Sequence, residues 1–167
     1  MGFRVEYVIK NQIGLAYGVG QGIWGSKDGL RVNYYYNKSP LGGYILAGIS
    51  NNSSSKGEKK YFNLEVERTN GFETTKSEES VAMEKKHVRT IDLGWGYAKK
   101  VGRNGKFFIE LGYAIRLHDT KKSYTLTYVE NAKHPGTTAQ INEDIERILS
   151  LYVPGGYMVG IGLMFGL

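Results

Sequence analysis

The last stretch of the chain, Gly155 to Leu167, reads GGYMVGIGLMFGL and decides the fold. Its residues alternate between two unlike faces, and a period of two is that of a β-strand, whose successive side chains point to opposite sides of the sheet. The large apolar face consists of Tyr157, Val159, Ile161, Leu163, Phe165 and Leu167. The small face consists of Met158, Gly160, Gly162, Met164 and Gly166. A soluble sheet would carry polar residues on one face, whereas a strand of a lipid-embedded barrel needs an apolar outer face and room inside, so the stretch predicts a membrane barrel strand.

This final strand resembles the C-terminal insertion signal of bacterial outer-membrane β-barrel proteins, and the residues that carry the resemblance are Tyr157, Phe165 and Leu167. In that family the last residue is usually aromatic, most often Phe, whereas here Phe165 lies two positions before the terminal Leu167. The resemblance is to the eight-stranded class, with OmpA-type transmembrane domains and OmpX-like proteins. It implies a protein of the bacterial outer membrane, in contact with lipid and lipopolysaccharide and inserted by the barrel assembly machinery.

The same alternation recurs along the chain and is clearest from Phe107 to His118. We expect further strands over 3–9, 12–23, 30–36, 44–50, 61–68 and 88–98, which with the last one makes about eight, the smallest size of this architecture. The prediction is therefore all-β: one domain over residues 1–167, a closed antiparallel up-and-down transmembrane β-barrel of about eight strands. The side chains expected to face lipid are Leu111, Tyr113, Ile115, Tyr157, Val159, Ile161, Leu163 and Phe165.

Two long segments, 69–86 and 119–154, are expected to be outer loops. Within the second, a strand is expected over 124–128, and apolar residues at helical spacing predict a short helix within 139–149. With eight strands both chain ends lie on one side of the barrel, the two long loops lie on the other, and the short turns at 24–29 and 99–106 face the periplasm.

Composition narrows the alternatives. The chain has 167 residues, a net charge of +6, no cysteine and a mean hydropathy of −0.37. No apolar run approaches the roughly 20 residues of a spanning helix, and the absence of cysteine excludes disulfides, thiolate metal sites and a Cys nucleophile. Basic residues are scattered among acids, so we expect contact with an anionic lipid surface and no nucleic-acid partner. Met1 leads directly into a strand pattern, and we expect a signal peptide to have been removed.

Charged residues recur opposite the apolar faces of the expected strands. Burying unpaired charge is costly, whereas arginine and carboxylate groups can pair inside a small polar barrel whose glycine-rich strands leave them room. We therefore predict an interior closed by a charge network. Its expected members are Arg4, Glu6, Arg31, Glu65, Glu67, Asp92, Glu110 and Arg116.

Catalytic chemistry has weaker support in the sequence. His118, Asp119 and Ser123 contain the residue types of a hydrolytic triad at the end of one expected strand, as in some lipid-modifying outer-membrane enzymes, but no motif joins them. His87 and His134 are single loop histidines, so no metal site is expected. Residues 18–22, GVGQG, lack the helix that a nucleotide-binding loop requires. We expect no catalytic residues and no cofactor.

The functional expectation is a structural, adhesion or surface-interaction role, with protein partners meeting the outer loops. Two alternatives stay open from the sequence. One is a narrow channel for ions or small solutes. The other is a soluble ligand-binding barrel of lipocalin type, in which the aromatic face would turn inward.

Overall fold

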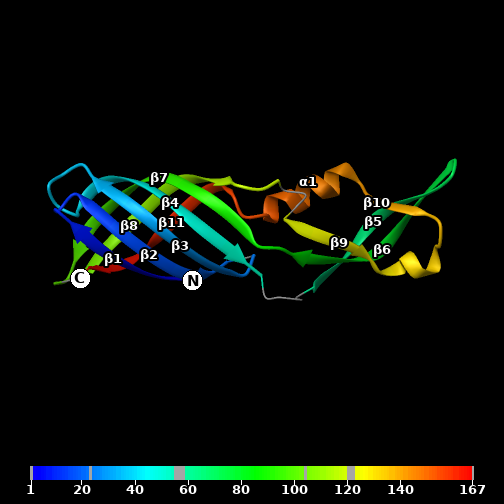
Figure 1. The fold of residues 1–167 in the computed structure, drawn as a ribbon, viewed down its shortest axis with the longest axis horizontal. Helices are drawn as coiled ribbons and strands as arrows, with labels where there is room; N and C mark the ends of the chain where they lie inside the picture. The colour runs from blue at the N-terminus through cyan, green and yellow to red at the C-terminus, as the bar shows by residue number, and fades with distance from the viewer. Residues whose placement is uncertain (1, 23, 55–58, 104, 120–122, 167) are drawn as a thin grey trace. The chain divides into compact units, whose positions relative to one another are not determined.

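The computed structural model describes residues 2–22, 24–54, 59–103, 105–119 and 123–166 (Figure 1). The chain divides into two compact units. We call Met1–Ser53, His87–His118 and Pro154–Leu167 the barrel unit, and Ser54–Lys86 and Asp119–Val153 the sheet unit.

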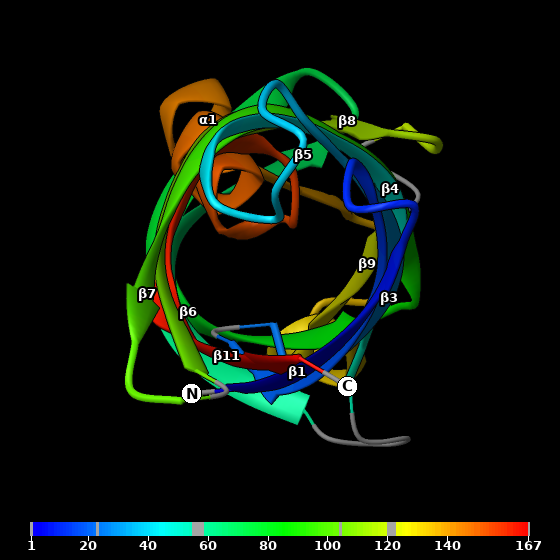
Figure 2. The same ribbon diagram turned by 90° about the vertical axis from the view of Figure 1, so that its left-hand side faces the viewer.

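The barrel unit contains seven strands among the described residues, and they follow one another around a ring (Figure 2). The order around the ring is β1, β11, β8, β7, β4, β3, β2. Every neighbouring pair is antiparallel except β1 and β11, which are parallel. The bounds are β1 (Gly2–Ile9), β2 (Ile13–Gln21), β3 (Ser26–Tyr35), β4 (Gly42–Ser53), β7 (Val88–Val101), β8 (Gly105–Arg116) and β11 (Gly156–Gly166).

The register around this ring is steeply staggered. Paired residues lead from Gly156 through Ala114, Asp92, Gly48, Arg31, Ala16 and Glu6 to Gly166, which lies ten residues further along β11. Such a stagger requires strands that tilt strongly against the barrel axis. It also brings Asp92, Arg31 and Glu6 onto one line of paired positions in which the intervening residues are glycine or alanine. Long polar side chains and small residues therefore alternate around the interior.

The ring closes along a short seam. β1 and β11 pair only at Val5 with Phe165 and at Glu6 with Gly166, whereas β11 pairs with β8 from Gly156 to Phe165. Among the described strand pairs, residues 157–163 of β11 have no partner on the β1 side. The barrel wall is therefore joined at one end of this seam and unpaired along the rest.

The sheet unit is an open sheet with strand order β10, β5, β6, β9 in the described residues. Val66, Val81, Met83 and Leu149 are buried in it. The Asn142 side chain accepts a hydrogen bond from the backbone N–H of Asp144 and so caps the helix α1. The bounds are β5 (Lys59–Asn70), β6 (Glu73–Lys85), β9 (Tyr124–Tyr128), the 3-10 helix η2 (Val129–Lys133), β10 (Thr138–Ile141) and α1 (Glu143–Tyr152).

The prediction of an all-β fold with antiparallel sheets is confirmed, but a closed eight-stranded barrel is wrong. The expected strand over 61–68 belongs to β5, which pairs with β6 and β10 and not with the ring. With seven strands in the ring, β1 and β11 run in the same direction, so the two chain ends lie at opposite ends of the barrel unit. The β2–β3 and β7–β8 connections also lie at opposite ends, contrary to the expectation that the short turns at 24–29 and 99–106 face the same side.

The two expected outer loops are not irregular. Residues 73–85 form β6, and the strand and helix predicted within 119–154 are confirmed as β9 and α1. The helix begins at Glu143, later than predicted, because residues 138–141 form β10 and Asn142 is its N-cap. No helix in the described part of the chain is long and apolar enough to cross a membrane.

Candidate functional site: the barrel interior

The two faces of the barrel strands differ completely in chemistry. Large apolar and aromatic side chains on every strand point outward and are exposed, among them Tyr7, Trp95 and Leu111. The carboxylates of Glu6, Asp92 and Glu110 and the amine of Lys106 are buried inside. A barrel in water has the reverse arrangement, because exposed apolar area is unfavourable there.

Glu110 on β8 lies at the centre of the largest ion-pair group. Arg4 of β1 donates to both of its oxygens, over 2.5 and 3.0 Å, and Arg31 of β3 donates over 3.2 Å. The Tyr44 hydroxyl of β4 donates a further hydrogen bond over 2.8 Å. The Glu110 carboxylate on β8 thus connects its own strand to β1, β3 and β4.

Asp92 on β7 extends this group. Arg31 donates to it over 3.1 Å, and the hydroxyls of Ser50 and Thr90 donate over 2.6 and 2.9 Å. The amine of Lys27 lies 3.8 Å away and its side chain is 37% exposed, whereas the Asp92 side chain is fully buried. Arg31 therefore bridges two carboxylates, and Lys27 is the more loosely held cation.

Glu6 on β1 forms a second group. It accepts hydrogen bonds from Lys106 over 2.7 Å, Asn33 over 2.8 Å and Tyr35 over 2.7 Å. A carboxylate that is removed from water needs such donors, because an unpaired buried charge costs several kcal/mol. These contacts tie β1 to β3 and to β8.

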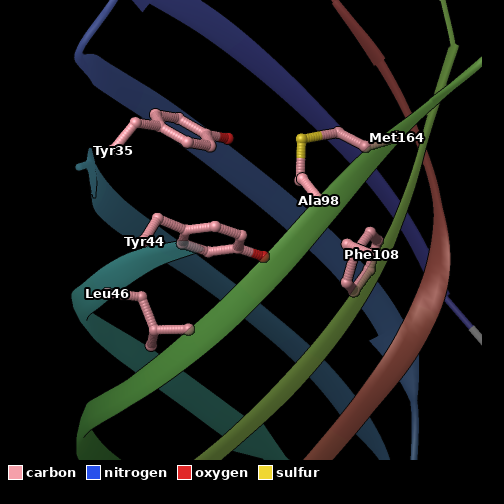
Figure 3. Close-up of a cluster of buried hydrophobic side chains, with 6 residues drawn as sticks. All are labelled: Tyr35, Tyr44, Leu46, Ala98, Phe108 and Met164. Carbon is pink, nitrogen blue, oxygen red and sulfur yellow. The ribbon is translucent and has the colours of Figure 1, made fainter. Parts of the chain in front are cut away.

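An apolar cluster fills the interior beside these groups (Figure 3). The rings of Tyr35 and Tyr44 lie 4.9 Å apart between centroids, and the guanidinium of Arg4 lies 4.5 Å from the centroid of the Phe108 ring. The cluster consists of Tyr35, Tyr44, Leu46, Ala98, Phe108 and Met164, all buried. Packed rings and ion pairs together occupy this part of the barrel.

Several glycines provide the space that the long side chains need. A Cβ atom at Gly14 would lie 2.1 Å from a carboxylate oxygen of Glu6, and one at Gly96 would lie 2.4 Å from the Tyr44 ring. At Gly48 a Cβ atom would lie 2.5 Å from Arg31. These contacts are far below van der Waals distance, so glycine is required at these interior positions.

Beyond the Arg4–Glu110–Arg31 group, the barrel unit holds a cavity of about 670 Å³. Polar groups of Lys27, Ser50 and Thr90 line its inner side, and Gly18 and Gly160 widen it. Its volume is that of a small-molecule site.

The structure brings together five of the eight residues expected in the charge network: Arg4, Glu6, Arg31, Asp92 and Glu110. The other three residues make different contacts. Glu65 and Glu67 lie on β5 of the sheet unit and pair with Lys76, and Arg116 donates to the backbone carbonyl of Pro154 over 2.9 Å.

Sequence reasoning missed two cations of the interior. Lys27 and Lys106 occur within the stretches 25–29 and 99–106, whose composition is that of turns. In the structure β3 begins at Ser26 and β8 at Gly105, so both lysines are inward-facing strand residues. The period of two would have found them if it had been extended backward from Arg31 through Gly29 to Lys27, and from Phe108 to Lys106.

The other predicted positions can also be placed. The side chains expected to face lipid from Leu111 to Ile115 and from Tyr157 to Leu163 are exposed on the outward face. Leu167 and the side chain of Phe165 lie outside the described residues, while Tyr157 is exposed.

The triad alternative gains no support from the hydrogen bond of its serine. The hydroxyl of Ser123 donates to the backbone carbonyl of Asp119 over 3.1 Å. His118 is exposed in the barrel unit, and His87 contacts the hydroxyl of Ser53 over 2.8 Å. No group of three His, Asp or Glu side chains within the described ranges is arranged to hold a metal ion.

The sheet unit contains one buried ion pair that the sequence did not reveal. Arg68 on β5 donates to both carboxylate oxygens of Glu79 on β6, over 2.5 and 2.6 Å, and Ser77 donates over 2.9 Å. The hydrogen bonds from Arg68 lower the pKa of Glu79 below its ordinary value.

The fold and its interior define a barrel that is apolar outside and charged and hydrogen-bonded inside. Comparison with family models, curated proteins and solved structures finds no match to this chain. Its function is therefore inferred from its own side chains.

Proposed function

We propose that the barrel unit is embedded in the outer membrane of a Gram-negative bacterium and that the protein has a structural or surface-interaction role. The observation that carries this proposal is the outward apolar face present on every barrel strand. A bilayer favours such a surface, and it requires strands whose backbone groups are paired. Six of the seven neighbouring pairs in the ring meet this requirement over long ladders, and the β1–β11 seam is the exception.

Strand length supports the same proposal. The barrel strands contain 8 to 14 residues, close to the roughly 9–11 that a tilted strand needs to cross the hydrocarbon core. Tyr and Trp side chains such as Tyr17, Tyr97 and Tyr157 add amphipathic rings to the outward face. Rings of this kind suit membrane–water interfaces.

We further propose that the interior does not conduct. The Glu6 and Glu110 groups and the cluster of Tyr35, Tyr44 and Phe108 occupy one part of the barrel with buried side chains joined by ion pairs and hydrogen bonds. Ion passage would require breaking these contacts. A steady channel for ions or small solutes is therefore the less favoured function.

A soluble lipocalin-type barrel is disfavoured by the same orientation. That alternative needs the aromatic face inside, whereas Tyr7, Trp95 and Tyr113 are exposed outside. The charged interior would also be a poor site for an apolar ligand.

The proposed interactions belong to the sheet unit. Both of its segments leave and re-enter the barrel at the end where β4 and β8 finish and β7 and β11 begin. It exposes Phe72 in the β5–β6 turn and Leu151 on α1, which are apolar groups that a partner at the cell surface could cover. We propose protein or lipopolysaccharide partners there, and no enzymatic chemistry.

Membrane insertion is testable with the two tryptophans, because Trp95 is exposed on the outward face and Trp24 is buried in the β2–β3 connection. We expect brominated acyl chains to quench Trp95 strongly in the Trp24→Phe variant refolded into vesicles. The Trp95→Phe variant, which keeps Trp24, is the matched control and should be quenched weakly. Protein that stays soluble without detergent and shows no quenching of Trp95 would contradict the proposal.

A further inference from the structure

The cavity in the barrel unit is lined by residues on both sides of the unpaired part of the seam between β1 and β11, and by Gln21, Asn52 and Pro154 at one end of the barrel. On β3, β4 and β7 only inward-facing residues line it, such as Arg31, Ser50 and Thr90. Flanking the seam, outward-facing side chains line it as well, including Phe3 and Ile161. The cavity therefore reaches from the polar interior to the apolar outer surface.

Its polar side carries an excess of positive charge. Three cations, Arg4, Lys27 and Arg31, and one carboxylate, Glu110, line the cavity. Glu110 already pairs with both arginines, and the Lys27 amine is 3.8 Å from Asp92, which is not part of the lining. Asp92 also pairs with Arg31, so Arg4, Lys27 and Arg31 together face two carboxylates and leave one positive charge in excess. Lys27 is the most exposed and most loosely held of these cations, so an anionic group placed beside it would be attracted by that one charge.

The apolar side has the chemistry of a hydrocarbon chain. Phe3, Val159, Ile161 and Leu163 line the cavity at the seam. Unpaired strand edges within a bilayer are unfavourable unless something shields or satisfies them. An occupant with an anionic head and an apolar chain would match the polar and the apolar side of the cavity.

We propose that this cavity binds an anionic phospholipid from the bilayer, with its phosphate against Lys27 and Arg31 and its acyl chain passing out between β1 and β11. This inference rests on the proposed membrane location. The acyl chain of the bound lipid would lie along residues 157–163 of β11, and the outward-facing side chains beside the seam would hold its first part.

The test uses the full chain in detergent micelles and native mass spectrometry with three probes. These are a single-chain phosphatidylglycerol, a phosphatidylcholine of the same chain length, and inorganic phosphate. We expect one bound phosphatidylglycerol, at least about tenfold weaker binding of phosphatidylcholine because it lacks net charge, and no retained phosphate.

Two variants address the two halves of the site. Lys27→Gln should weaken phosphatidylglycerol binding by about tenfold. Lys100→Gln is its control, because this exposed lysine does not line the cavity. Gly18→Leu should abolish binding while the barrel still folds, because a Cβ atom there meets only ordinary contacts, the nearest at 3.6 Å, and the side chain would fill the cavity.

Equal binding of the two lipids, or an unchanged affinity in Lys27→Gln and Gly18→Leu, would overturn the proposal. If inorganic phosphate bound with the same affinity as phosphatidylglycerol, the cavity would be a site for a free anion, and the proposal of a bound lipid would be overturned. Absence of Trp95 quenching in vesicles would instead contradict membrane insertion. Failure of the lipid site can therefore be distinguished from failure of the proposed membrane location. A barrel that inserts but binds no probe would overturn only the lipid site.

Discussion

At the scale of single residues, the barrel depends on pairs in which a glycine faces a long side chain. Gly96 opposite Tyr44 is the tightest of these that involves a ring, and the Tyr44 hydroxyl in turn donates to Glu110. Displacing the ring would therefore disturb an ion-pair group as well as the apolar cluster. The effect of one methyl group at this position should be large for so small a change.

We predict that Gly96→Ala destabilises the folded barrel by about 1–3 kcal/mol, the usual cost of overpacking an interior. The measurement is urea unfolding from vesicles, followed by intrinsic fluorescence. Gly18→Ala is the matched control, an interior glycine on β2 where a Cβ atom has room. Equal stability of the two variants would show that the interior at Tyr44 is not packed as described.

At the scale of elements, the β5–β6 hairpin is held by the buried pair of Arg68 and Glu79. The pKa of Glu79 is depressed by the hydrogen bonds from Arg68, so folding favours the ionised carboxylate. A group with a depressed pKa contributes stability that is present above the unfolded value near 4.5 and is lost as the pH falls through the lower folded value. The hairpin should therefore loosen in acid.

We predict that the β5 and β6 amides lose protection against hydrogen exchange, corrected for intrinsic rates, as the pH falls from about 6 to about 3. Glu79→Gln should remove most of this pH dependence and lower the protection already present at neutral pH. Glu78→Gln, an exposed neighbour, is the control and should leave both unchanged. A wild-type profile in Glu79→Gln would exclude Glu79 as the titrating group.

At the scale of the whole molecule, the number of strands in the ring decides which chain segments share a side of the membrane. Seven strands place the turn around Gly22 at one end of the barrel unit and the turn around Arg103 at the other. An eight-stranded ring, as the sequence suggested, would place the short turns together. Sidedness therefore tests the strand order directly.

We predict that single cysteines introduced as Gly22→Cys and Arg103→Cys are labelled from opposite sides of the membrane. The chain has no native cysteine, so a membrane-impermeant maleimide applied to intact cells reports each site cleanly. The Gly22 site should label together with Phe72→Cys if the sheet unit leaves the barrel from the same end. Labelling of both Gly22→Cys and Arg103→Cys from outside would contradict the seven-stranded ring.

The sequence by itself determined the strands of the ring and the faces of most of them, whereas β6 and β10 lie in segments expected to be outer loops. The alternation of side chains along a strand can be recognised without knowing which strand lies beside it. For this reason Leu111 and Ile161 were assigned correctly to the outer face, and Asp92 and Glu110 to the inner face. Lys27 and Lys106 were missed because each lies near the first residue of its strand, among charged residues and glycines whose composition is that of a turn.

Tertiary structure alone decided which sheet each strand joins. Glu65 and Glu67 alternate as barrel residues do, but hydrogen bonding of β5 to β6 places them in another unit, and this also reduces the ring to seven strands. The ion-pair partners and the incomplete seam between β1 and β11 depend on the ten-residue stagger around the ring. That stagger is a property of seven strands pairing together, and no single strand encodes it, because side-chain alternation is the same in every register that differs by two.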